Sequence, residues 1–232
     1  MANYMLIGDV HSQGTAFSKA LKYAKERSLT PVLLGDLFDS RTTNSETVYT
    51  YNLVRDAQRD GAIVLNSNHQ HRLLTTLTDR TSNEVAAYNA ETWRSVTEFD
   101  EAQIDTDELV TWLSSLPDGF VFYCKNGREH CCAHAYFPTQ LRMKTDTVPY
   151  SYTVKTDEPE LKEKMLWGPY DSARRRVRWW RKDPQQSWVR CAGHYHTVFQ
   201  GENNIVLDAG AGFDGGEIPG WDVNKREFVT FC

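Results

Sequence analysis

The sequence lacks the long apolar segments that membrane insertion or secretion would require. No apolar run reaches the roughly 20 residues of a membrane-spanning helix. The amino terminus, MANYMLIGDV, has neither the basic flank nor the extended apolar region of a signal peptide. We therefore expect no association with a membrane and a cytoplasmic location.

Cysteines are few, and positively charged residues are outnumbered by negatively charged ones. The 232 residues include five cysteines, an odd number, and Cys131 and Cys132 are adjacent. This arrangement does not suit a disulfide framework and fits a reducing compartment. Lys and Arg number 26 against 31 Asp and Glu, which gives a formal net charge of -5. We therefore expect no stable binding to nucleic acid.

Internal repeats and low-complexity linkers are missing as well. Hydrophobic residues make up 40% of the chain, enough to build a substantial core and to argue against disorder. A chain of this length suits one α/β domain, and we expect a single domain over residues 1–232.

The first third of the chain alternates short apolar runs with amphipathic stretches. The runs at residues 4–7, 31–34 and 62–65 predict buried strands, and the stretches at 16–27 and 45–59 predict helices. Strands separated by helices indicate parallel strands joined by crossover helices.

The rest of the chain predicts a mixture of elements. Helices are expected at 84–93 and 106–116, the second beginning at the capping-box-like Thr106. The Asn126-Gly127 pair predicts a hairpin between strands at 120–124 and 129–133. Residues 139–159 are interpreted as a loop, and further strands are expected at 188–192, 197–200, 205–207 and 227–231.

Five short motifs fall at the ends of these strands or just after them. In order, they are Gly8-Asp9-Val10-His11, Gly35-Asp36-Leu37-Phe38-Asp39, Asn68-His69, the lone His134, and Gly193-His194-Tyr195-His196. Ligands of parallel α/β sheets collect at the carboxyl ends of the strands. Asp, His and Asn are ligands suited to Mn, Fe or Zn.

Each motif alone also has a purely structural interpretation. A Gly-Asp pair after a strand is often only a turn or a helix cap, Asn68-His69 could be an ordinary loop pair, and His134 could be a buried, hydrogen-bonded histidine. The order of the motifs and their common placement favour one joint metal site.

The ordered set resembles the calcineurin-like metallophosphoesterase superfamily, whose pattern is GDxH, GDxxDR, GNHE/D, a lone His and GHxH. Within it, the chain is similar to the phosphoprotein-phosphatase branch of bacteria and phages. Met165-Leu166-Trp167-Gly168 and the Asp208-Ala209-Gly210 segment with Gly215-Gly216 also resemble that branch. The resemblance implies a four-layer α/β/β/α sandwich of two mixed sheets.

The resemblance also implies two divalent metal ions, with Mn²⁺ expected first and Fe, Zn or Ni as alternatives. One metal would be held by Asp9, His11 and His196, the other by Asn68, His134 and His194, with Asp36 bridging both. Two cations about 3.5–4 Å apart can clamp an in-line displacement and convert a bridging water into the attacking hydroxide. His69 would be the general acid, oriented by Asp39, because a nearby carboxylate favours imidazolium.

The chain departs from the family pattern around the phosphate. Ser40 replaces the usual Arg, Ser67 the usual Gly, Gln70 the usual acidic residue, and Pro169 stands where some relatives carry an Arg. Arg41 or Arg72 could bind the phosphate instead, because arginine offers a bidentate fork to phosphate oxygens.

We expect hydrolysis of phosphate monoesters, with phosphoserine and phosphothreonine as candidate substrates. The alternative is a phosphodiesterase or nucleotide pyrophosphohydrolase acting on cyclic nucleotides or dinucleoside polyphosphates, because His-x-His is common among diesterases. A third hypothesis is a noncatalytic metal-bound module, against which the retention of His69 and Asp39 argues.

One concentrated basic stretch, residues 173–182, stands outside these motifs. We interpret it as a surface helix with Val177 and one or both of Trp179 and Trp180 packed inward. The alternative is a lip that supplies Arg to a polyanionic substrate and Trp for stacking on a base.

Overall fold

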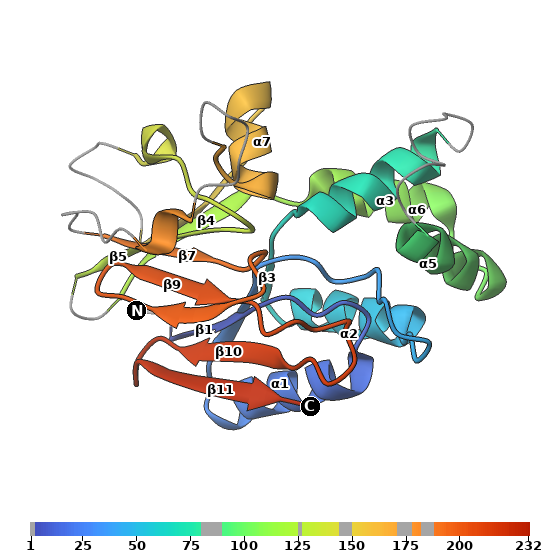
Figure 1. Cartoon of the computed structure of the whole chain (residues 1–232), viewed down its shortest axis with the longest axis horizontal. Helices are drawn as coiled ribbons and strands as arrows, with labels where there is room; N and C mark the ends of the chain where they lie inside the picture. Colours follow the sequence, from blue (N-terminus) through green and yellow to red (C-terminus); the bar gives the residue numbers. More distant parts are fainter. Residues whose placement is uncertain (1–2, 80–89, 125–126, 144–149, 171–177, 182–187) are drawn as a thin grey trace.

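Two β-sheets form the centre of the molecule (Figure 1). The computed structural model describes residues 3–79, 90–124, 127–143, 150–170, 178–181 and 188–232. In these residues the first sheet has the order β11-β10-β1-β2-β3, and the second has the order β6-β4-β5-β7-β9-β8.

The strands of the first sheet are β1 (Tyr4–Ile7), β2 (Thr30–Leu33), β3 (Ile63–Val64), β10 (Ile218–Asp222) and β11 (Glu227–Phe231). Those of the second are β4 (Gly119–Tyr123), β5 (Glu129–Ala133), β6 (Ser151–Val154), β7 (Val189–Ala192), β8 (Val198–Gln200) and β9 (Asn204–Leu207). Both sheets are mixed: β1, β2 and β3 pair in parallel, as do β5, β7 and β9, and the outer strands pair antiparallel.

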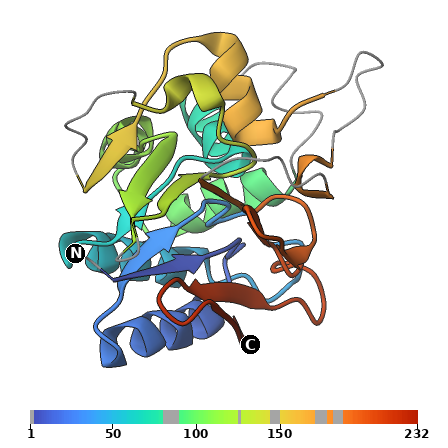
Figure 2. The same ribbon diagram turned by 90° about the vertical axis from the view of Figure 1, so that its left-hand side faces the viewer.

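Helices α1 (Gly14–Glu26) and α2 (Thr47–Arg59) cover the outer face of the first sheet. Helix α7 (Pro159–Trp167) contributes Met165 to the outer face of the second. Figure 2 shows α1 and α7 at opposite ends of the stacked layers. Helices α3 (Asn68–Thr78), α5 (Ala90–Glu101) and α6 (Thr106–Ser115) form a separate group beside the first sheet (Figure 1).

The alternation of side chains along β1 shows how the layers pack. Met5 and Ile7 join the core beneath α1 and α2, whereas Tyr4 and Leu6 join the core between the two sheets. Successive side chains of a strand point to opposite faces, so a strand buried on both faces needs the continuous apolar run that the sequence shows. The predicted four-layer α/β/β/α sandwich is confirmed.

Several predicted elements need correction. Residues 139–159 are not only a loop, because they contain a short 3₁₀ helix at Thr139–Leu141 and strand β6. Helix α6 is capped by Asp105, whose side chain accepts a hydrogen bond from the Glu108 backbone N–H, and not by Thr106. Helices α3 and α7 and strand β10 were not predicted. Residues 84–89 and the Asn126 position of the hairpin lie outside the described residues.

The described part of the basic stretch supports the inward packing of its tryptophans. Trp179 and Trp180 are 6% and 7% exposed, and Arg178 beside them is exposed. Val177 and the residues before it lie outside the described residues. No helix in the described ranges has the length and apolar character to cross a bilayer.

Candidate dinuclear metal centre

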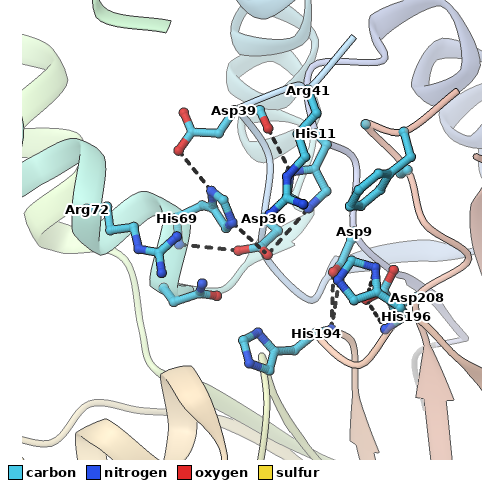
Figure 3. Close-up of a pocket in the computed structure, with 14 residues that line it drawn as sticks. Asp9, His11, Asp36, Asp39, Arg41, His69, Arg72, His194, His196 and Asp208 are labelled. Carbon is cyan, nitrogen blue, oxygen red and sulfur yellow. Dashed lines mark hydrogen bonds and ion pairs between the residues drawn. The ribbon is translucent and has the colours of Figure 1, made fainter. Parts of the chain in front are cut away.

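The five predicted motifs meet in one place. Asp9 and His11 follow β1, Asp36 and Asp39 follow β2, Asn68 and His69 open α3 after β3, His134 follows β5, and His194 and His196 follow β7. All of them except His134 line a pocket of about 180 Å³, which Figure 3 shows. His134 is completely buried behind it. The parallel strands therefore bring together residues that are up to 187 positions apart in the sequence.

Asp36 stands between two groups of imidazoles. Its Oδ1 lies 3.3 Å from Nε2 of His134, and its Oδ2 lies 3.5 Å from Nε2 of His11. His134 Nε2 in turn lies 3.0 Å from Nδ1 of His194. The two oxygens of one carboxylate therefore face different histidines, which is the arrangement a bridging ligand requires.

Backbone carbonyls fix the orientation of both imidazoles that face Asp36. His11 Nδ1 donates to the Phe38 carbonyl at 3.0 Å, and His134 Nδ1 donates to the Leu34 carbonyl at 3.1 Å. A carbonyl can only accept, so each Nδ1 carries a proton, and in the neutral imidazole each Nε2 then presents a lone pair toward the carboxylate. A hydrogen bond that fixes the tautomer in this way is the usual support of a metal-ligating histidine.

Asn68 adds an oxygen that has no partner in the described structure. Its side-chain Oδ1 is buried and accepts no hydrogen bond. Leaving such an atom unsatisfied costs free energy, whereas a bound cation would satisfy it. The Nε2 atoms that face Asp36 and this orphaned oxygen both fit a pair of divalent ions.

Asp9 supports the His194 turn as well as lining the pocket. Its two carboxylate oxygens accept the His194 backbone N–H at 3.2 and 3.1 Å. A Cβ at Gly193 would lie 2.0 Å from Asp9 Oδ1, so only glycine lets the carboxylate approach this closely.

Asp208 is a site residue to which sequence reasoning gave no role. It is 2% exposed, lines the same pocket, and accepts the His196 backbone N–H at 2.5 Å and the Gly210 N–H at 3.0 Å. The side chain of His196 is the most open of the candidate ligands, at 56% exposure, with its Nδ1 4.0 Å from Asp208 Oδ2. The short Asp-x-Gly motif at 208–210 was the available signal for Asp208.

Charge and burial set the pKa values in the site. Burial raises the pKa of Asp9 well above its ordinary value, and the neighbouring carboxylates of Asp208 and Asp36 raise it further. Burial opposes ionisation of Asp36, but attraction to His134, His69 and His11 outweighs it and holds the pKa of Asp36 well below its ordinary value. Burial also lowers the pKa of His11, which favours the neutral form that ligates metals.

His69 and Asp39 form the predicted pair. His69 Nδ1 lies 2.9 Å from Asp39 Oδ2. Burial tends to lower the pKa of His69, but the charge of Asp36 and the hydrogen bond to Asp39 outweigh burial and raise it. His69 Nε2 also lies 3.8 Å from Asp36 Oδ2 and within ligand reach of His11, so proximity alone does not separate an acid from a ligand.

Several of these residues hold a backbone conformation with positive φ, which residues other than glycine rarely adopt. His11, Asp36, Asp39, His194 and His196 have φ values of 46°, 47°, 69°, 73° and 46°. Backbone strain of this kind persists only where surrounding structure enforces it, and it clusters at functional sites.

Comparison with known proteins identifies the architecture. No protein-family model matches the sequence, and no curated protein matches it. Solved structures match over 99% of this chain. A putative diadenosine tetraphosphatase is 16% identical, with a TM-score of 0.57 over 92% of its own chain. A hypothetical protein from Pyrococcus horikoshii OT3 is 10% identical, with a TM-score of 0.53 over 87% of its chain. A protein serine/threonine phosphatase from Saccharomyces cerevisiae is 11% identical, with a TM-score of 0.51 over 79% of its chain.

The chain has the calcineurin-like metallophosphoesterase fold. At these sequence identities the likeness establishes the fold, and the activity rests on the residues of the site.

Two departures from the metallophosphoesterase pattern have a structural explanation. Ser67 Oγ accepts the Asp36 backbone N–H at 2.9 Å, and Gln70 Oε1 accepts the Leu37 N–H at 3.2 Å. Gln70 also donates to the Leu65 carbonyl at 2.9 Å. Ser67 and Gln70 therefore hold the turn that carries Asp36, and Ser67 caps α3 at the same time.

The two candidate phosphate-binding arginines both line the pocket but differ in their surroundings. Arg41 lies 3.4 Å from Glu91, and its guanidinium lies 4.6 Å from the ring centre of Phe213. Arg72 makes no ion pair with a described residue. Figure 3 shows Arg72 on the His69 side of the pocket and Arg41 on the side of His11.

Tyr195, between two candidate ligands, packs and does not face the pocket. Its hydroxyl accepts a hydrogen bond from Trp179 Nε1 at 2.9 Å, and its ring lies 4.2 Å from that of Trp180. The described end of the basic stretch therefore supports the His194–His196 turn from behind.

Proposed function

We propose that this protein is a metal-dependent hydrolase of phosphate monoesters, with phosphoserine and phosphothreonine as candidate substrates. The observation that carries the proposal is Asp36, whose two oxygens face His134 and His11 at 3.3 and 3.5 Å while carbonyls orient both imidazoles. In their neutral forms both imidazoles would present a lone pair to a carboxylate oxygen, a contact that is repulsive unless a cation lies between them.

In this proposal Asp9, His11 and His196 hold one ion, and Asn68, His134 and His194 hold the other, with Asp36 shared. Four carboxylates line the pocket among the described residues, those of Asp9, Asp36, Asp39 and Asp208. Two divalent cations would balance their charge. When bound, the ions would supply Lewis acidity at the phosphoryl group and a water of lowered pKa; Mn²⁺ is the metal we propose, with Fe, Zn or Ni as alternatives.

The protein's own residues would position the substrate and handle the proton. His69, kept protonated by Asp36 and Asp39, would donate its Nε2 proton to the departing alcohol oxygen. Arg41 or Arg72 would bind phosphoryl oxygens at the rim of the pocket. The small pocket admits the phosphoryl group and leaves the alcohol near the surface.

A second candidate function is hydrolysis of nucleotide diesters or anhydrides. The similarity to a putative diadenosine tetraphosphatase favours it, and so does Arg72, which has no described carboxylate partner and is free to meet further negative charge.

The test compares p-nitrophenyl phosphate with bis(p-nitrophenyl) phosphate, using protein loaded with Mn²⁺. Faster turnover of the monoester supports a phosphatase, and faster turnover of the diester supports the second candidate. Absence of metal-dependent turnover on both esters would contradict both candidates.

A further inference from the structure

We propose that Arg72 is a specificity-determining residue that recognises negative charge on the leaving group, so that the preferred substrates are phosphoanhydrides, or esters with an anionic group next to the scissile bond. The inference rests on the proposed function, in either of its two candidate forms, and narrows the substrate class.

Arg72 and His69 lie on the same side of the pocket. Both residues are in α3, three positions apart, and residues at this spacing lie on the same face of a helix. Both line the pocket, and Figure 3 shows the Arg72 side chain beside the His69 ring.

The leaving group would depart on the side of the phosphoryl group that faces His69. In hydrolysis, the oxygen of water forms a bond to phosphorus, and the bond from phosphorus to the leaving oxygen breaks. If His69 protonates that oxygen, the leaving group lies against His69 and therefore against Arg72. A phosphate leaving group departs as a stable anion without needing the proton, and the guanidinium then stabilises its charge.

The two arginines differ in how far their charge is already engaged by described residues. Arg41 already lies beside Glu91 and Phe213, and its backbone N–H donates to the Gly212 carbonyl at 3.0 Å. Arg72 is partly buried and makes no ion pair with the described residues. A partly desolvated guanidinium gains more free energy from an anionic partner than an exposed one does. Arg72 is therefore the arginine better placed to recognise negative charge on the substrate.

The test uses two esters that differ by one charge, N-acetyl-O-phosphoserine with its free carboxylate and the same compound with the carboxylate converted to an amide. ADP and p-nitrophenyl phosphate form a second pair. With Mn²⁺-loaded wild-type protein, we expect kcat/KM to favour the charged member of the phosphoserine pair and ADP in the second. Arg72→Gln should reduce each preference by about 10- to 100-fold.

Two variants serve as controls. Arg72→Lys keeps the charge and should retain most of the preference. Arg59→Gln removes an exposed charge at the end of α2 and should leave all four rates and both preferences unchanged.

The outcomes separate this inference from the proposed function. Equal losses on both members of each pair in Arg72→Gln would mean that Arg72 clamps the scissile phosphoryl group, and would overturn the inference while the hydrolase stands. An unchanged preference would also overturn it. If wild-type protein hydrolyses none of the four compounds, the proposed function fails and this inference fails with it.

Discussion

Asp39 holds His69 by a hydrogen bond of 2.9 Å between Oδ2 and Nδ1, and the same carboxylate is itself held by α5. Thr92 donates to Asp39 Oδ2 at 2.6 Å, and Ser95 donates to Oδ1 at 2.8 Å. Asp39 is 1% exposed. The helix group beside the first sheet therefore fixes the geometry of the proposed general acid.

Replacement of His69 should separate chemistry from metal binding. His69→Asn should keep both metals and lose roughly 10²–10⁴ in turnover on esters with poor leaving groups. The loss should be much smaller on p-nitrophenyl phosphate, because nitrophenolate departs without protonation. Rates on alkyl and nitrophenyl esters, with metal analysis of each preparation, check this. Equal losses on both esters would assign His69 to phosphate positioning, and loss of one metal would make it a ligand.

Removal of the α5 support should have a smaller effect of the same kind. We expect Ser95→Ala to lower turnover on alkyl phosphates by about 3- to 30-fold, because Asp39 loses the hydrogen bond to its Oδ1 and the one that its backbone N–H donates to Ser95 Oγ. Metal content should not change. Thr97→Ala is a matched control, because among the described residues the Thr97 side chain donates only to the Trp93 carbonyl within α5. A Ser95→Ala variant with unchanged leaving-group dependence would contradict the supporting role.

Asp36→Asn should lose metal as well as rate. An amide offers one oxygen acceptor and no charge, so it cannot face His134 and His11 as the carboxylate does. We expect fewer than two metals per chain and a large loss of turnover. A variant that keeps two metals per chain and near-normal turnover would show that Asp36 is not the shared ligand.

His130 predicts a pH dependence of folding. Burial lowers the pKa of His130 to about 4, while its ring stacks on Phe122 and lies 3.2 Å from Cys124 Sγ. Between the folded pKa and the unfolded value of 6.5, the unfolded chain binds more protons. The stability from neutral His130 is therefore fully present above the unfolded pKa and is lost as the pH falls toward 4.

The expected size of this term is up to about 3 kcal/mol. Denaturant unfolding of wild type and His130→Gln between pH 4 and 7 measures it as a difference in slope, since the variant lacks this titration. His71→Gln provides a comparison: burial also lowers the pKa of His71 on α3, so its removal should change the slope in the same direction but by less. Parallel pH profiles of wild type and His130→Gln would contradict the assignment.

Patterns of short range made the fold and the site partly predictable from sequence. The apolar runs located β1, β2 and β3 because each strand is buried on both faces. The motifs at their ends located the candidate ligands because parallel strands end at the same edge. The assignment of each ligand to a metal and the single-domain organisation remain predictions.

Two of the missed elements, α7 and β10, carry sequence signals that argue against the structure they form. Helix α7 has Pro159 at its start and many charged residues, so no helix was predicted there, although proline is favoured at the first helical position. Strand β10 contains Pro219 and Gly220, which usually argue against an inner strand. Helix α3 could have been found, because Ser67 and Gln70 have capping-box spacing.

The support residues could not have been found from the sequence in the same way. Thr92 and Ser95 contact Asp39 across 53 and 56 positions, and nothing local marks either as part of the site. Contacts of this kind depend on how helices and sheets pack, and a pattern of short range does not encode them.

The central claim is that two metal ions at Asp36 carry out phosphate ester hydrolysis. Protein is treated with chelator, dialysed, and titrated with Mn²⁺ while bound metal is measured by elemental analysis and turnover by p-nitrophenyl phosphate hydrolysis. We predict that metal-free protein is nearly inactive and that activity rises in step with occupancy to two Mn²⁺ per chain. Undiminished hydrolysis by protein shown to be free of metal would contradict the claim.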